Sequence, residues 1–137
     1  MKAPVSPAVI VRSAGDVALA LAPGRPLTLL SAPGAAAFGG PLWWVTLAGS
    51  ARRLAATEIA DLLDAGDAPG LALAAFRCGC RDVVLAPCPA WDAVAAVAAE
   101  IGARLHAVLP LSLDLGTPAS AHRLVAWLDR DTPMPLP

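Results

Sequence analysis

The sequence contains little charge, few aromatic residues and only three cysteines. Charged residues make up 15% of the 137 residues, aromatic residues make up 4%, and tyrosine is missing. Hydrophobic residues account for 57%, so the chain has enough apolar surface to fold, and disorder is excluded as its main state. Lys+Arg count 10 against Asp+Glu 11, and no basic run is longer than the pair Arg52–Arg53. This balance excludes a strongly basic nucleic-acid-binding protein.

Long uninterrupted apolar runs are also missing. Arg12 and Asp16 cut the first apolar run, whereas a secretory signal needs roughly 7–15 unbroken apolar residues. Residues 26–51 carry no charge until Arg52, but Pro33-Gly34 and Gly39-Gly40-Pro41 interrupt them with turn and helix-start signals. A membrane-spanning helix needs about 20 continuous apolar residues. We therefore expect neither a signal peptide nor a transmembrane helix.

The cysteines do not form a recognisable framework. Cys78, Cys80 and Cys88 are an odd number, and Cys78-Gly-Cys80 lacks the second pair that a zinc site requires. We expect reduced thiols packed as small hydrophobic residues, and hence a cytoplasmic protein. The phosphate-binding fingerprints G-x-G-x-x-G and G-x-x-x-x-G-K-[ST] are both missing, so neither a cofactor nor a metal is expected.

What is present is an alternation of short apolar runs with longer segments rich in alanine and leucine. The predicted strands are 8–12, 26–31, 59–64, 82–86 and 105–109. The predicted helices are 14–22, 41–54, 69–78, 90–101 and 118–130. The third strand has an alternative, because residues 59–64 can also extend the preceding helix. Residues 8–130 form a single domain in this prediction, and residues 1–7 and 131–137 are tails.

This alternation predicts βαβ units and a mostly parallel, five-stranded sheet. The strands are continuously apolar, as is typical when both faces of a sheet are covered. The predicted fold is therefore an α/β three-layer sandwich with helices on both faces, of flavodoxin-like or Rossmann-like type. The strand order is left open.

In such a sheet, ligands bind beyond the carboxyl ends of the strands. Two similar turns, Ala32-Pro33-Gly34 and Ala68-Pro69-Gly70, each place proline and glycine at a helix start. A helix start with free N–H groups attracts anions. The predicted residues for a small anionic ligand are Ser13, Ser31, Gly34, Ala35, Asp67, Gly70 and Leu71. The alternative is that the turns only start helices. Ser13 can also act as the N-cap of the predicted helix 14–22.

Three side chains are candidates for catalysis. Asp64 and Asp67 follow one predicted strand and can bind Mg²⁺ or act as a general base. Alternatively, Asp67 caps the next helix and Asp64 accepts backbone hydrogen bonds. Cys88 precedes a predicted helix, where a thiol pKa can fall, and either His106 or His122 can approach it in space. The alternative for Cys88 is a buried thiol.

The predicted helices are unusually apolar. The segment Trp91–Ile101 carries only Asp92 and Glu100 as charges, and the neighbours Trp43 and Trp44 point about 100° apart on one helix. Soluble monomers rarely expose large apolar patches. We therefore expect a homo-oligomer, most simply a homodimer.

The stretch Leu63–Gly79, together with Ser31-Ala-Pro-Gly34, resembles a family of short bacterial α/β proteins of unknown function. The resemblance extends over most of the chain. It implies the α/β fold and no known activity, so it assigns no catalytic residue.

Three functions remain open. The first is a non-catalytic, oligomeric module that binds a small anionic metabolite at the carboxyl ends of the strands. The second is a small enzyme that uses Asp64 and Asp67 or Cys88. The third is a protein–protein interaction domain with an apolar patch around Trp43, Trp44 or the Trp91 helix. Neither nucleic acid nor a membrane is an expected partner.

Overall fold

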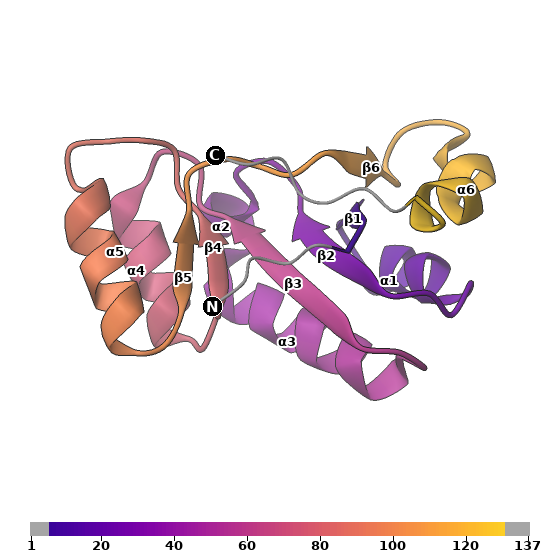
Figure 1. Cartoon of the computed structure of the whole chain (residues 1–137), viewed down its shortest axis with the longest axis horizontal. Helices are drawn as coiled ribbons and strands as arrows, with labels where there is room; N and C mark the ends of the chain where they lie inside the picture. The colour runs from indigo at the N-terminus through magenta and orange to yellow at the C-terminus, as the bar shows by residue number, and fades with distance from the viewer. Residues whose placement is uncertain (1–5, 131–137) are drawn as a thin grey trace.

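The computed structural model describes residues 6–130 and contains one all-parallel sheet (Figure 1). Its strands are β1 (Ala8–Val11), β2 (Leu27–Ser31), β3 (Ile59–Asp64), β4 (Asp82–Val84), β5 (Arg104–His106) and β6 (Ser112–Asp114). Its helices are α1 (Ala14–Leu21), α2 (Ala35–Phe38), α3 (Gly40–Leu54), α4 (Pro69–Arg77), α5 (Trp91–Glu100), the 3₁₀ helix η1 (Ser120–Arg123) and α6 (Leu124–Leu128). The predicted tails lie outside the described residues, apart from residues 6 and 7. The α/β class and the parallel sheet are confirmed.

The sheet has six strands, whereas five were predicted. All five predicted strands have counterparts, and β3 has the predicted bounds. The additional strand, β6, pairs with β1 over Ser112–Asp114. Three residues are too few to show a periodic pattern, so β6 could not be recognised locally.

The strand order β5-β4-β3-β2-β1-β6 is neither the Rossmann nor the flavodoxin order. From β1 to β5 the chain always steps to the neighbouring strand in the same direction. Because parallel crossovers are right-handed, steps in one direction place their helices on one face of the sheet. The contacts agree, since α1 contacts α3, α3 contacts α4, and α4 contacts α5. They do not confirm the predicted three-layer sandwich with helices on both faces.

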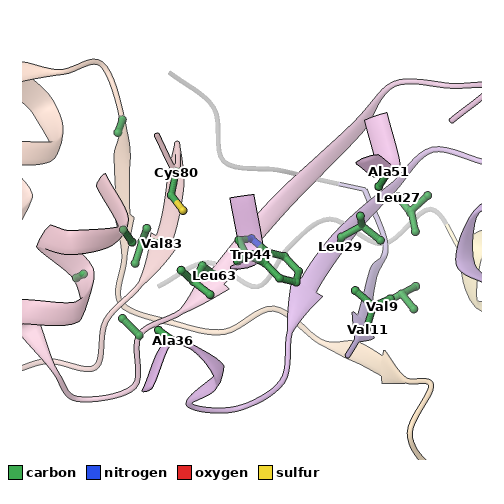
Figure 2. Packing of buried hydrophobic residues seen from close by; sticks show 14 of the residues in the cluster. Val9, Val11, Leu27, Leu29, Ala36, Trp44, Ala51, Leu63, Cys80 and Val83 are labelled. Atoms are coloured by element: carbon green, nitrogen blue, oxygen red, sulfur yellow. The ribbon is translucent and has the colours of Figure 1, made fainter. Parts of the chain in front are cut away.

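The main core lies between this helical layer and the sheet. Figure 2 shows Trp44 of α3 between Leu63 of β3 and Leu29 of β2. Trp44 is fully buried, and its indole N–H donates to Asp61 Oδ1 at 3.3 Å. The other face carries a separate, smaller cluster formed by Ile10, Leu30, Leu62 and Val84, one residue from each of four strands. Within residues 6–130, no helix contributes to this second cluster.

One short connection joins the two edges of the sheet. The chain leaves β5 at His106 and enters β6 at Ser112, on opposite edges, as Figure 1 shows. Five strand spacings of roughly 4.8 Å amount to about 24 Å, and the steps from residue 106 to 112 reach at most about 22 Å. Residues 107 and 108 bend, so the twist and coiling of the sheet must bring its two edges closer together than this spacing. Pro110 is buried within this connection.

Candidate functional site

The carboxyl ends of β2 and β3 meet at one edge of the sheet, as the sequence predicts. The backbone N–H of Asp64 donates to Ser31 Oγ at 2.9 Å, so the two strand ends are directly linked. Both residues are buried. The Ser31 and Asp64 corners therefore belong to a single rim.

The Asp64 carboxylate is engaged by the backbone. Oδ1 accepts a hydrogen bond from Gly66 N at 2.8 Å, and Oδ2 accepts a longer one from Gly34 N at 3.4 Å. These contacts agree with the alternative prediction, in which Asp64 accepts backbone hydrogen bonds. Its carboxylate ties the Gly34 turn to the Gly66 turn, so an anion of the protein already lies where an anionic ligand was expected.

The first Ala-Pro-Gly turn has few donors to offer a ligand. Gly34 has φ 67°, a left-handed conformation that favours glycine, and its N–H is taken by Asp64. The next amide, Ala35 N, donates to Ala32 O at 3.0 Å. The following helix, α2, has only four residues and hence a small dipole.

The second turn is more open, but Asp67 does not cap its helix. The N-cap residue of α4 is Ala68, which makes no side-chain cap, and Asp67 is exposed without a hydrogen bond in residues 6–130. The predicted capping role of Asp67 is therefore wrong. Leu71 N donates to Ala68 O at 3.1 Å, while Gly70 is exposed with open space in front of its Cα.

Ser13 has a local role. Its Oγ accepts a hydrogen bond from Asp16 N at 3.1 Å, which confirms the predicted N-cap of α1. The Asp16 carboxylate accepts from Arg12 N at 2.9 Å, one residue before the cap. Both interactions stabilise the start of α1.

The cysteines are packed against the core. Burial is the main reason why the pKa of the Cys80 thiol rises to about 12, which keeps it protonated and unreactive at neutral pH. Cys88 is half-buried and packs against the main core, and its carbonyl accepts from Trp91 N at 3.0 Å. In residues 6–130, neither cysteine hydrogen-bonds to a histidine, and no three His, Cys, Asp or Glu residues cluster as metal ligands.

The predicted aromatic surface is also largely inside. Trp44 is buried, Trp43 lies 5.9 Å from it between ring centroids, and the Trp91 indole N–H donates to Leu85 O at 3.0 Å. Other large apolar residues are exposed, among them Phe38, which is 89% exposed, and Leu42. They lie at the end of α2 and the start of α3.

Sequence reasoning missed a cluster of charge on the face of the sheet that the helices leave uncovered. Asp82 of β4 is buried and lies beside Arg104 in the register of β5. Its Oδ2 accepts from Arg104 Nη2 at 3.1 Å, and its Oδ1 lies 2.8 Å from Arg104 Nε and 2.8 Å from His106 Nε2. The sequence contains one indication of this cluster. Arg104 and His106 place polar side chains at alternate positions of a short strand, whereas a strand covered on both faces is apolar throughout.

A second missed cluster lines a concave site, which we call the basic hollow. Its volume is about 400 Å³, and it lies beside β6, η1 and α6. Its lining residues are Ser112, Leu113, His122, Arg123, Ala126, Trp127 and Arg130. None of them is acidic. A site of this size falls in the range of small-molecule pockets.

The wall of the basic hollow is held in place by Trp127. The indole N–H donates to Ala8 O at 2.8 Å, which ties α6 to β1. The Arg130 guanidinium lies 4.6 Å from the centroid of the Trp127 ring, a cation–π contact. The positive charge of Arg130 is thus positioned at the wall.

Within residues 6–130, the carboxylates nearest in sequence to this site are paired with other arginines. Asp114 forms an ion pair with Arg12 and accepts from Gly116 N at 2.8 Å. The bonds from Arg12 are the main reason why the pKa of Asp114 is lowered. Asp129 pairs with Arg25. Among residues 6–130, Arg123 and Arg130 form no ion pair.

No protein-family model and no curated protein matches this chain. Between residues 6 and 130, none of the helices combines the length and apolar character that crossing a bilayer requires. The functional interpretation therefore depends on the chemistry of the sites described above.

Proposed function

We propose that this protein is a non-catalytic binding module for a small anionic ligand, and that the ligand binds in the basic hollow. One observation carries this proposal. Two arginines and a histidine line a single concavity of about 400 Å³, and none of its lining residues within the described part of the chain, 6–130, is acidic. A carboxylate or phosphate is the complementary ligand, because guanidinium groups bind both through charge-assisted hydrogen bonds.

The basic hollow has better support than the rim at the carboxyl ends of the strands. At the rim, the Gly34 and Ala35 amides are already bonded, and the Asp64 and Asp67 carboxylates would repel an anion. Of the residues predicted there, Gly70 has the most open space. The predicted class of ligand is kept, and its location changes.

A second hollow provides a comparison within the same molecule. It has a volume of about 390 Å³, and its lining includes Arg25, Asp129 and Arg130. Arg25 and Asp129 form an ion pair there, so much of its charge is neutralised internally. The basic hollow has no such internal acid among its lining residues, which favours it as the anion site.

The enzyme alternative has weaker support. Both carboxylate oxygens of Asp64 accept backbone hydrogen bonds, which suits a structural role better than that of a general base. Cys88 packs against the main core. These contacts favour binding over catalysis for the residues on which the enzyme hypothesis depends.

A homodimer in the cytoplasm is part of the same proposal. Exposed Phe38 and Leu42 support self-association, since large apolar side chains are unfavourable in water. The three cysteines are unpaired, which suits a reducing compartment. The interaction-domain alternative would use the same two apolar residues to bind a different protein.

Calorimetric titration with inorganic phosphate and citrate tests the proposed function. We expect binding to the wild-type protein and at least a tenfold weaker affinity for the double variant Arg123→Ala/Arg130→Ala, because each lost charged hydrogen bond costs about 1.5–3 kcal/mol. Arg77→Ala is the matched control, since Arg77 is exposed on α4, away from the basic hollow. Equal affinity of the double variant and the wild type, or no binding of either anion, would overturn the proposal.

A further inference from the structure

Among residues 6–130, no further strand pairs with β6 at this edge of the sheet, and the basic hollow lies beside it. β6 ends the strand order, and Ser112 and Leu113 of this strand belong to the lining of the hollow. A strand at the edge of a sheet has backbone N–H and C=O groups that a further strand can pair with. The site therefore combines positive charge with an unpaired stretch of backbone.

The register identifies which backbone groups face outward. Leu113 lies beside Val9, and Leu115 N donates to Ile10 O at 3.2 Å, so residues 113 and 115 point toward β1. Backbone groups alternate in direction along a strand, so those of Ser112 and Asp114 point toward the free edge. The Asp114 carbonyl already accepts from Thr117 N and Thr117 Oγ1. Ser112 N and O and Asp114 N are the groups left to pair with an added strand.

Charge decides which strand can bind there. Two copies of this chain paired through β6 would bring two basic hollows close together, and their arginines would repel each other. An extended segment with acidic side chains meets Arg123 and Arg130 instead and is attracted by both. Charge complementarity thus favours an acidic peptide over a second copy.

We propose that the small anionic group bound in the basic hollow is a side-chain carboxylate of an extended acidic peptide segment from a partner protein, which adds as a strand beside β6. This proposal rests on the proposed function and names the ligand class of the same site. Backbone hydrogen bonds to Ser112 and Asp114 align the segment, and a carboxylate two residues along it reaches the arginines. Addition of a strand to a sheet edge is a common mode of peptide recognition.

The experiment uses three probes with the full chain. The first is a labelled hexapeptide of alternating valine and glutamate, the second is the same peptide N-methylated at alternate residues, and the third is glutarate. N-methylation removes backbone donors and keeps the charge, whereas glutarate has carboxylates without a peptide backbone. Affinities are measured by anisotropy for the peptides and by calorimetry for glutarate, and amide NMR shifts locate the binding.

We expect the hexapeptide to bind at least tenfold more tightly than its N-methylated form and than glutarate. The amides of Ser112 and Asp114 should shift on binding, and Arg130→Ala should weaken it at least fivefold. If all three probes bind equally, the peptide proposal is overturned while the anion site stands. If none of them binds and phosphate and citrate also fail, both proposals are overturned. If the molecular mass in solution rises with protein concentration, and this self-association depends on the β6 edge, the occupant is a second copy of the chain. That result would also overturn the peptide proposal.

Discussion

Two clusters of arginine and histidine lie at opposite edges of the sheet, and they differ in whether a carboxylate lies among them. Arg104 and His106, on β5, surround the buried carboxylate of Asp82. Arg123 and His122, near β6, line the basic hollow together with Arg130, and no carboxylate from residues 6–130 belongs to that lining. The basic residue types are the same in both clusters, and only the β5 cluster also contains an acidic side chain.

This difference separates a structural role from a binding role. A buried carboxylate that pairs with an arginine and hydrogen-bonds to a histidine is satisfied within the protein, and its interactions hold β5 against β4. Arginines without an internal partner retain their charge for a ligand. Three substitutions test this distinction.

Removing the acid of the β5 cluster should cause the largest loss of stability. We expect Asp82→Asn to lower the free energy of unfolding by about 2 kcal/mol, because Arg104 loses its counter-charge and His106 loses its carboxylate partner. The effect is below the roughly 3–5 kcal/mol of a fully buried pair, since Arg104 is partly exposed. Urea denaturation measures it. Asp67→Asn, an exposed acid, is the control, and equal losses for the two variants would contradict the structural role of Asp82.

Adding an acid to the basic hollow should convert it into a neutralised cluster. Ala126 of α6 lines the basic hollow together with Arg123 and Arg130, so Ala126→Glu adds a carboxylate to the same lining. We expect anion affinity to fall at least tenfold by calorimetry. The free energy of unfolding should change by less than about 1 kcal/mol, because an exposed ion pair contributes little to stability.

Ala126→Gln is the matched control, because it has nearly the same shape without the charge. It should keep most of the affinity. If the two variants weaken binding equally, loss of space rather than charge explains the effect, and the electrostatic interpretation of the hollow fails.

The exposed ion pair Arg12–Asp114 should show the smallest effect. Its arginine lowers the pKa of Asp114, so the pair stabilises the folded state above the unfolded pKa of 3.8 and loses this contribution as the pH falls through the folded value. The contribution is well under about 1 kcal/mol, because Arg12 is 42% exposed and water screens the pair.

The measurement compares the unfolding free energy of the wild type and Asp114→Asn at about pH 6 and about pH 3. The two proteins should differ slightly at the higher pH and converge at the lower one. If Asp114→Asn lowers the free energy of unfolding as much as Asp82→Asn does, solvent exposure does not determine how much an ion pair stabilises this protein.

The sequence predicted the elements that depend on neighbouring residues. The N-cap of α1 at Ser13 and the bounds of β3 follow from local patterns, and both are confirmed. Proline at the start of α4 is correctly placed as well. The predicted cap at Asp67 failed because Ala68 occupies the N-cap position, a shift of one residue that local patterns do not resolve.

The candidate sites were harder to predict, because each depends on residues far apart in the chain. Asp64 binds the amide of Gly34, 30 positions earlier, and this contact occupies the expected anion site. Asp82 meets His106 across 24 positions. Trp127 binds Ala8 across 119 positions and so forms the wall of the basic hollow. A local sequence pattern cannot predict contacts between residues so far apart in the chain.

Local sequence patterns are enough to predict that this chain alternates short apolar strands with alanine-rich helices, because hydrophobic spacing, prolines and capping residues act over a few positions. They do not predict that the helices α1, α3, α4 and α5 form one layer, that β6 lies at an edge, or which charges find a partner. Strand order and charge pairing are set by the packing of the whole chain, because residues distant in sequence compete for the same neighbours.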